Sequence, residues 1–388
     1  MEALTGYPRP DGRWGIRNHV LVLPLHSAAN LAAERIADGV PGVVSIGHQW
    51  EAAGDDPDLE RIAGTLAGFA ANANVFATVM IGIRPGDRWI ADLARNRGGE
   101  VHLIAMADHQ GTQGTVAAAR PLVERLAAEA AGQERRPMPI AGLVLGLECG
   151  GSDALSGITA NPALGVASDL LVAAGGTSIL AETPELIGAE QILAARAVTP
   201  EVGRRVIETI TRFEEAIRDL GVDVRGAQPT PGNQAGGLTT IEEKSLGAAK
   251  KGGDAPVAGV VEFAHAPSGT GLHIMDTPGH DIEQMVGMVA GGANIVAFTT
   301  GRGTPTGSAI TPVLKIATNT AIFERLEGDI DVNAGAILDG GETLESMGRL
   351  IYQRLLEVAA GQTTSSERRG NREFAISRTV SPMNSFSG

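Results

Sequence analysis

The sequence contains only one cysteine, Cys149, among its 388 residues. A single thiol excludes a disulfide within the chain and any metal cluster that requires four cysteines from one polypeptide. Aromatic residues are also scarce, at 3%. The core must therefore be built mainly from Ala, Val, Leu and Ile, while 52 glycines indicate many tight loops in which the backbone can approach a ligand closely.

Long apolar runs are missing as well. No stretch of 18 apolar residues occurs, and residues 1–5 lack the basic and apolar parts of a signal peptide. We therefore expect no membrane span and a cytoplasmic location.

Positive charge is in short supply too, since the net charge is −14. Nucleic acid is not expected as a partner, because phosphate binding needs a basic face. A small anionic substrate remains compatible with this charge, since a local group of Arg and backbone N–H donors can hold a carboxylate.

The length of the chain predicts two domains. In residues 1–132, apolar runs typical of strands alternate with helical patterns, which predicts a parallel sheet covered on both faces. The predicted strands are 20–23, 43–46, 75–82 and 101–106, and the predicted helices are 28–38, 58–71, 89–96 and 112–131.

A charged segment that ends in proline, residues 132–137, predicts a linker to a second domain over residues 138–388. Residues 231–253 are rich in Gly and Lys and are predicted to be irregular over much of their length, and the tail after Gly361 shows little periodicity. The fold expected is α/β, with two domains that each contain a mostly parallel sheet flanked by helices. In the second domain the predicted strands are 140–147, 178–181, 257–263, 295–299 and 314–317, and the main predicted helices are 161–174 and 199–220.

Four polar loops follow predicted strands or lie between them, at residues 148–153, 182–185, 275–279 and 299–305. Ligands of open parallel sheets bind beyond the carboxyl ends of the strands. Together these loops predict a cleft that holds small anionic groups with backbone N–H donors, hydroxyls and one Arg.

Single residues of these loops allow two interpretations each. Cys149 is either a small buried apolar residue or a thiol that binds metal or handles protons. Glu182 and Glu185 either cap a helix or take part in catalysis, and Asp276 is either a turn residue or a base. Arg302, between two glycines, favours anion binding. The lysines at 244, 250 and 251 allow a purely solvated role.

The same loops resemble a known family. Residues 149–153 (Cys-Gly-Gly-Ser-Asp), with Ser-Gly-Ile at 156–158 and Asn-Pro-Ala at 161–163, resemble the altronate and galactarate dehydratase family. That family also contains the large subunit of sulfolactate sulfo-lyase. The resemblance covers nearly the whole chain, with further matching segments at 6–18, 175–185, 232–245, 275–279, 298–305 and 333–335.

The resemblance implies β-elimination from a small hydroxy acid, usually with a divalent metal, Fe²⁺ or Mn²⁺. Removing a proton beside a carboxylate requires that the resulting dianion be neutralised by a metal, Arg or backbone donors. The hypothesis assigns catalysis to Cys149, Ser152, Asp153, Glu182 and Glu185. It assigns metal binding to Cys149, Glu182 and His48. It assigns substrate binding to Asn161, Lys244, Asp276, Thr277, Thr300 and Arg302.

Two departures from the family pattern stand out. Relatives usually carry cysteines in the first domain, where this chain reads Leu-His-Ser-Ala at 25–28, His-Gln-Trp-Glu-Ala-Ala at 48–53 and Ile-Gly-Ile-Arg-Pro at 81–85. The small β-rich domain of the single-chain dehydratases is also missing, which implies a small β-rich partner subunit. A homo-oligomer is expected besides.

Three functions therefore stand side by side. The first is dehydration of a sugar acid of the altronate or galactarate kind to a 2-keto-3-deoxy acid. The second is loss of sulfite from sulfolactate. The third is a non-catalytic, acid-binding paralogue that has lost the metal ligands of the first domain.

Overall fold

The computed structural model describes residues 4–51 and 58–378 of the chain. In the N-terminal half of this part, four parallel strands form a sheet in the order β4-β3-β5-β6. The strands are β3 (His19–Pro24), β4 (Val43–Ser45), β5 (Val75–Gly82) and β6 (Val101–Ala105). The helices are α1 (Asn30–Ala37), α2 (Leu59–Ala70), α3 (Arg88–Asn96) and α4 (Gly111–Ala131).

Both faces of this sheet are covered. Along β3, Val20 and Val22 pack with α1 and α4, whereas Leu21 and Leu23 pack with α2 and α3. Alternate side chains of a strand point to opposite faces, so a strand buried on both sides reads as a continuous apolar run. That is the pattern which predicted this strand.

The C-terminal half contains a second parallel sheet, with seven described strands in the order β10-β11-β9-β8-β12-β13-β14. Strands β9, β11 and β10 follow outward from β8 on one side, and β12, β13 and β14 follow on the other, so the direction of chain progression changes between β8 and β12. The strands are β8 (Val144–Cys149), β9 (Thr177–Leu180), β10 (Val257–Val261), β11 (Gly271–Met275), β12 (Ile295–Thr300), β13 (Val313–Ala317) and β14 (Val332–Asn333).

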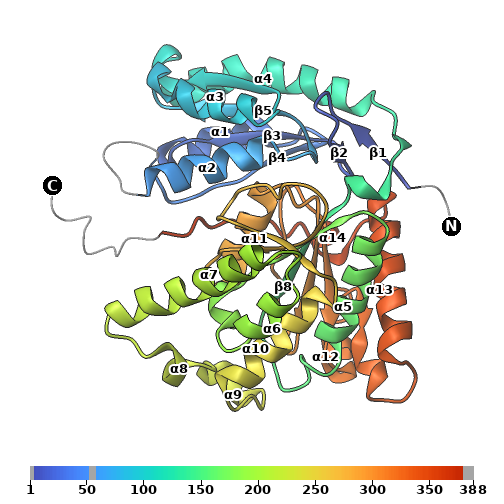
Figure 1. Ribbon diagram of the computed structural model, residues 1–388. Coiled ribbons are helices and arrows are strands. Elements are labelled where there is room, and N and C mark those ends of the chain that lie inside the picture. Colours follow the sequence, from blue (N-terminus) through green and yellow to red (C-terminus); the bar gives the residue numbers. More distant parts are fainter. Residues whose placement is uncertain (1–3, 52–57, 379–388) are drawn as a thin grey trace.

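Helices cover both faces of this sheet too. Leu164 of α5, Val206 of α7 and Ile351 of α13 share one core with the sheet, while α11 covers the other face and packs against α2 of the N-terminal half (Figure 1). The helices are α5 (Ala160–Ala173), α6 (Glu190–Ala195), α7 (Pro200–Asp219), α8 (Val224–Ala227), α9 (Pro231–Ala235), α10 (Ile241–Ala249), α11 (Asp281–Ala290), α12 (Thr320–Arg325), α13 (Leu344–Ala359) and α14 (Ser365–Arg369).

A small antiparallel sheet connects the two halves. It consists of β1 (Thr5–Pro8), flanked by β2 (Trp14–Gly15) and β7 (Arg136–Pro137). The segment predicted as a linker therefore ends in a strand that is paired with the start of the chain.

The last described residues run between the two halves (Figure 1). Phe374 meets the ring of Phe69 edge-on, with 4.8 Å between ring centroids, and the indole N–H of Trp50 donates to the carbonyl of Ile376 at 3.1 Å. The core that contains these contacts also includes Phe298 of β12. A single apolar core therefore spans both halves.

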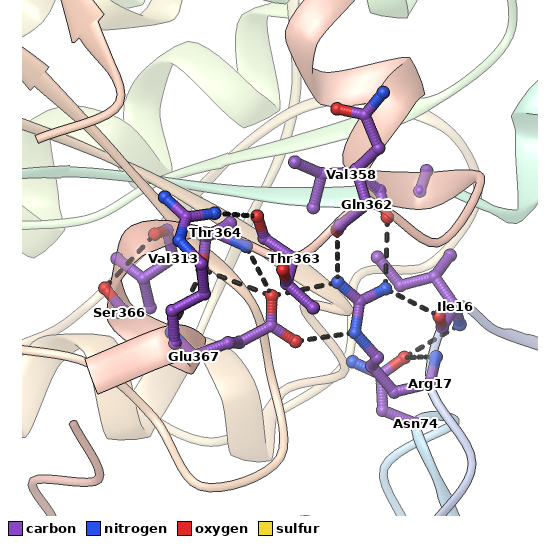
Figure 2. A network of polar contacts seen from close by, with 12 residues as sticks. Ile16, Arg17, Asn74, Val313, Val358, Gln362, Thr363, Thr364, Ser366 and Glu367 are labelled. Atoms are coloured by element: carbon purple, nitrogen blue, oxygen red, sulfur yellow. Dashed lines mark hydrogen bonds and ion pairs between the residues drawn. The ribbon is translucent and has the colours of Figure 1, made fainter. Parts of the chain in front are cut away.

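A polar network fixes the same boundary (Figure 2). The Arg17 guanidinium forms a two-pronged ion pair with Glu367 of α14, at 2.6 and 2.9 Å. It also donates to the carbonyls of Val358 and Gln362, at 3.0 and 2.8 Å. One N-terminal arginine thereby holds the end of α13 and the start of α14.

The fold class expected from the sequence is confirmed, but residues 231–253 contradict their prediction. They form α9, α10 and the 3-10 helix Lys250–Gly252, which we call η6. Strand β11 and helices α11 and α13 were not predicted from the sequence pattern. Residues 52 and 53 of the cysteine-free stretch after His48, and the tail beyond residue 378, lie outside the described residues. Among the described residues, no helix is both long and apolar enough to span a bilayer.

Candidate active site

The carboxyl end of β8 is the centre of the candidate site. Cys149 ends this strand opposite Thr299 of β12, and the amide of Gly150 donates to the Thr299 carbonyl at 3.1 Å. Beyond these residues both strands continue into loops, and the Gly301 amide donates to the Gly151 carbonyl at 3.3 Å. This is the point of a parallel sheet at which ligands usually bind.

Glu182 packs directly against Cys149. The Cys149 amide donates to Glu182 Oε1 at 2.8 Å, and the thiol lies 3.3 Å from Oε2. Glu182 has a left-handed backbone, with φ of 73°, and its amide donates to Thr277 Oγ1 at 2.7 Å. A non-glycine residue in this conformation is uncommon and is typical of constrained functional positions.

Two buried lysines neutralise the glutamates. The Lys251 ammonium of η6 forms an ion pair with Glu182, and neither side chain is exposed. Lys244 of α10 binds Glu185 Oε1 at 2.8 Å and also donates to the side-chain oxygens of Gln228 and Asn233, both at 3.1 Å. Buried charges persist when they are paired and hydrogen-bonded, as they are here.

The pKa values follow from this arrangement. Burial raises the pKa of Glu185, and the Glu182 charge raises it further, although Lys244 and Lys251 oppose this. Burial alone would lower the pKa of Lys251, but the groups of Cys149 and Glu182 outweigh it and raise this pKa. Burial and the Glu182 charge together raise the pKa of the Cys149 thiol well above its ordinary value. The thiol is therefore protonated at neutral pH.

A second acid lies behind this pair. Glu148 is wholly buried, and its Oε1 accepts a hydrogen bond from Gln284, whose amide also donates to Glu182 Oε1 at 3.3 Å. Burial and then the Glu182 charge raise the pKa of Glu148 well above its ordinary value. Glu148 therefore favours its own protonated, uncharged form, and it shares the Gln284 amide with Glu182.

A cavity of about 250 Å³ opens in front of this cluster. Its charged lining residues are Glu185, Lys244, Asp281 and Arg302. Ser152 contributes a hydroxyl 3.6 Å from the Cys149 sulfur. In the described part of the chain, the Arg302 guanidinium has no ion-pair partner, and it approaches Gly232 so closely that a Cβ there would lie 2.7 Å from Nη1. The remaining lining residues are Gly150, Gly151, Pro184, Gln228, Thr230, Asn233, Ile241 and Gly279.

Cys149, Glu182 and Glu185 form a group of metal-ligating side chains, with one ligand atom of each lying within 4.8 Å of the others. In this arrangement the group does not fit a divalent cation. The Lys251 and Lys244 ammonium groups already neutralise the two carboxylates, and the thiol is held protonated, whereas metal ligands must be deprotonated. An ion could bind only if Lys251 left its position.

His48 is not part of this group, which corrects its expected role as a ligand beside Cys149. Its Nε2 lies 2.9 Å from the Pro24 carbonyl, and its Nδ1 accepts from the Trp50 amide at 3.2 Å. Burial lowers the pKa of His48. With both ring nitrogens bound to backbone, the neutral ring holds the loop after β4 in place.

Asp153 and Asn161 connect elements around the cavity and are not among its lining residues. Asp153 accepts hydrogen bonds from Ser156 at 3.0 Å and from Thr318 at 2.9 Å. The Asn161 amide donates to the Gly247 carbonyl of α10 at 3.0 Å, and its oxygen accepts from Thr299 at 2.6 Å. Both arrangements are typical of positioning residues.

The other proposed substrate-binding residues divide in the same way. Asp276 is engaged by the Thr183 hydroxyl at 2.8 Å and by Arg212 at 2.6 Å. Thr277 positions the Glu182 amide, and Thr300 Oγ1 accepts from the Gly303 amide at 3.0 Å. Of the six residues assigned to substrate binding, Lys244 and Arg302 line the cavity.

Sequence reasoning missed several members of the site. Lys251, for which a solvated role was allowed, is wholly buried. Asp281, Gln284 and Asn233 were not singled out, and the Asn233 amide donates to the Ser152 carbonyl at 3.0 Å. A usable signal was the helical spacing of Lys244, Gly247 and Lys251, which places the two lysines on one side of α10 and η6. It was overlooked because the segment was taken to be irregular.

Comparisons with known proteins agree with this architecture. Residues 140–381 match the family described as D-galactarate/Altronate dehydratase, C-terminal. Residues 6–131 match the one described as D-galactarate dehydratase/Altronate hydrolase, second domain. The two matches together take in most of the described chain.

Individual relatives carry related names. The chain is 36% identical to the (2R)-sulfolactate sulfo-lyase subunit beta of Chromohalobacter salexigens, over 96% of each chain. It is 34% identical to the altronate dehydratase of Bacillus subtilis, over 96% of this chain and 76% of that one. It is also 40% identical to the galactarate dehydratase (L-threo-forming) of Escherichia coli, over 67% of this chain and 50% of that one.

Proposed function

This chain belongs to the D-galactarate/altronate dehydratase family, and from that premise we propose that it is a lyase which removes water from a sugar acid. The substrate is an acid of the altronate or galactarate kind, and the product is a 2-keto-3-deoxy acid. Relatives named as dehydratases support the reaction class.

The observation that carries this proposal is the charge arrangement of the cavity. Glu185 lines a cavity large enough for a small acid. Burial raises the pKa of this glutamate, whereas the ion pair with Lys244 lowers it. A raised pKa makes a carboxylate a stronger base, while the ammonium keeps it ionised. At the same cavity, the Arg302 guanidinium, which has no ion-pair partner among the described residues, suits a substrate carboxylate.

The elimination then proceeds through these residues. Arg302 binds the substrate carboxylate, and Glu185 Oε2 takes the proton from the carbon next to it. The electron pair of that C–H bond forms the new C=C bond as the β-hydroxyl leaves. The Lys244 ammonium and the Gly150–Ser152 backbone, which line the cavity, stabilise the added negative charge. The resulting enol becomes the 2-keto acid when C3 takes up a proton.

A divalent ion, Fe²⁺ or Mn²⁺, would require a different arrangement of the same group. Such an ion acts as a Lewis acid on substrate oxygens. Here the Lys251 ammonium occupies the space beside Glu182 Oε2. The steps above are therefore assigned to side chains and backbone groups. Metal analysis of the purified protein tests this point, since one ion per chain that is lost in Cys149→Ser would contradict it.

Loss of sulfite from a sulfolactate-like acid is the second candidate. It is favoured by the similarity to a sulfo-lyase subunit over 96% of both chains. Because that relative is named as a subunit, we further propose that a partner polypeptide completes this protein. A non-catalytic acid-binding protein is a third candidate. The buried pairs Lys244–Glu185 and Lys251–Glu182 disfavour this third candidate. Burying charge costs free energy, and binding alone does not require such pairs beside the cavity.

A substrate screen tests the proposal. Purified protein, with and without added Fe²⁺ or Mn²⁺, is incubated with altronate, galactarate and sulfolactate, and 2-keto products and sulfite are measured separately. We expect a 2-keto-3-deoxy acid without sulfite from a sugar acid. Sulfite from sulfolactate alone would favour the second candidate, and no product from any acid would favour the third.

A pair of variants assigns the residues. Glu185→Gln is expected to lower kcat by about 10²–10⁴-fold, which is typical of a lost general base. Arg302→Lys is expected mainly to raise KM, because a single ammonium replaces a planar, two-pronged donor. Unchanged kinetics in both variants would contradict the assignment.

A further inference from the structure

Asp281 is a cavity-lining acid that the mechanism above does not use. It is the first residue of α11 and lines the cavity beside Gly150, where the loop after β8 begins. Of the two carboxyl groups that line the cavity, Glu185 is bound by Lys244. Within the described residues, the Asp281 carboxyl forms no ion pair and no hydrogen bond with another side chain.

The backbone of the Cys149 loop is shaped around this carboxyl. A Cβ at Gly150 would lie 1.9 Å from Asp281 Oδ2 and 2.6 Å from its Cγ. A side chain at position 150 would therefore displace Asp281, so the glycine permits a close approach of the acid to the strand end that carries Cys149.

The charges around Asp281 favour its protonated form. Burial raises its pKa, and the Glu185 charge raises it further, while His280 and Lys251 act in the opposite direction. Glu148 also faces it from β8. In the described part of the chain, Lys244 opposes protonation of Glu185, whereas no ion pair opposes protonation of Asp281.

We propose that Asp281 is the proton donor to the departing hydroxyl. This inference rests on the proposed dehydration and adds the acid that it requires. Asp281 and Glu185 line the same cavity, so a bound acid can present its α-proton to Glu185 and its β-oxygen to Asp281.

Atoms and charges balance in this step. Glu185 gains the α-proton, the α C–H electron pair forms the C=C bond, and the β C–O bond breaks. The oxygen leaves with its bonding pair, takes the Asp281 proton and departs as water. Glu185 is then protonated and Asp281 ionised. Glu185 then releases a proton to solvent and Asp281 takes one up, so both return to their starting states.

The same residue points to the leaving group. Hydroxide is a poor leaving group and needs a proton as the C–O bond breaks, whereas sulfite is the weakly basic anion of a much stronger acid and can leave unprotonated. A carboxyl group that lines the cavity and acts as proton donor therefore favours loss of water over loss of sulfite.

A leaving-group experiment tests the inference. The hydroxy acid accepted by the wild type is compared with its β-fluoro analogue, because fluoride leaves without full protonation. Asp281→Asn should lower kcat for the hydroxy acid by about 10²–10⁴-fold, yet change kcat for the fluoro acid by less than about 10-fold. Asp281→Glu should restore part of the first activity.

The outcomes separate the two proposals. Equal losses on both acids, or no loss on either, would overturn the role of Asp281 while leaving the dehydration intact. If the wild type dehydrates no acid, the proposed function fails and the role of Asp281 with it. Glu283→Gln, in the same turn of α11 but not among the cavity-lining residues, is the matched control and should behave as wild type.

A measurement without turnover gives an independent check. In an infrared titration, Asp281→Asn should remove one carboxyl band that takes up its proton above the ordinary pKa of an aspartate, whereas Glu283→Gln should not. Gly150→Ala should displace Asp281 and reproduce the leaving-group dependence of Asp281→Asn. If the band persists in an Asp281→Asn protein that folds normally, the inference is overturned.

Discussion

Lys251 illustrates, at the level of single residues, how the site depends on buried charge. Its ammonium is unexposed and contacts the equally unexposed Glu182, whose other oxygen holds the Cys149 amide. Removing one partner of such a pair leaves the other charge buried without compensation. Lys251 therefore stabilises the strand end that carries Cys149.

Replacing Lys251 by Met should lower the free energy of unfolding by about 3–5 kcal/mol. Adding Glu182→Gln should recover part of this loss, because the uncompensated charge then disappears. Denaturant unfolding of both variants measures the effect. The neighbouring Lys250 is exposed, so Lys250→Met should change stability by less than about 0.5 kcal/mol. A Lys251→Met protein as stable as wild type would contradict the account.

At the level of elements, α5 holds η6 and thereby Lys251. A Cβ at Gly165 of α5 would lie 2.2 Å from the Lys250 carbonyl and 3.0 Å from Gly253. The two elements touch backbone to backbone, which only glycine permits. The position of the Lys251 ammonium is therefore set by a glycine on another element.

Gly165→Ala should displace η6 and cost about 1–3 kcal/mol, the usual cost of overpacking. It should also lower kcat, because Lys251 moves with η6. The control is Gly64→Ala in α2, where the nearest neighbour of a Cβ is an Arg97 side chain at 3.5 Å. That change should be neutral or stabilising by up to about 1 kcal/mol. Thermal unfolding and turnover are measured for both variants. Equal changes in stability and kcat for Gly165→Ala and Gly64→Ala would contradict the role of Gly165.

At the level of the whole molecule, the two halves are joined by one core and by the contacts of Arg17. Burial acts to raise the pKa of Glu367, but the hydrogen bond and charge of Arg17 outweigh it and hold this pKa below its ordinary value. The ionised carboxylate therefore stabilises the folded state. This contribution is complete above the ordinary pKa of a glutamate and fades as the pH falls through the lower, folded value.

Glu367→Gln should therefore reduce stability by about 1–3 kcal/mol at neutral pH. Its difference from wild type should shrink as the pH is lowered below the ordinary glutamate pKa of 4.5. Chemical unfolding across this pH range provides the measurement. Glu134→Gln, at an exposed position, should show no such pH dependence. A difference that grows on acidification would contradict the assignment.

Much of the architecture was predictable from the sequence. The strands β3, β5, β8 and β12 appear as short apolar runs because each is buried on both faces. The loop at 148–153 stood out because Cys, Ser and Asp follow such a run among glycines. Residues 231–253 were misjudged because their three helices are short, and the packing of Gly247 against Gly157, rather than propensity, stabilises them.

The sequence by itself determined the α/β class, the family pattern and the position of the Cys149 loop at a strand end, because these depend on local periodicity and on residue types in fixed order. Only the tertiary structure decided which charges meet. Lys251 pairs with Glu182 and Lys244 with Glu185, whereas Asp281 has no ion-pair partner within the described residues and His48 lies elsewhere. Pairing between residues 59 and 69 positions apart depends on which loops the sheet brings to one edge, and chain spacing does not encode it.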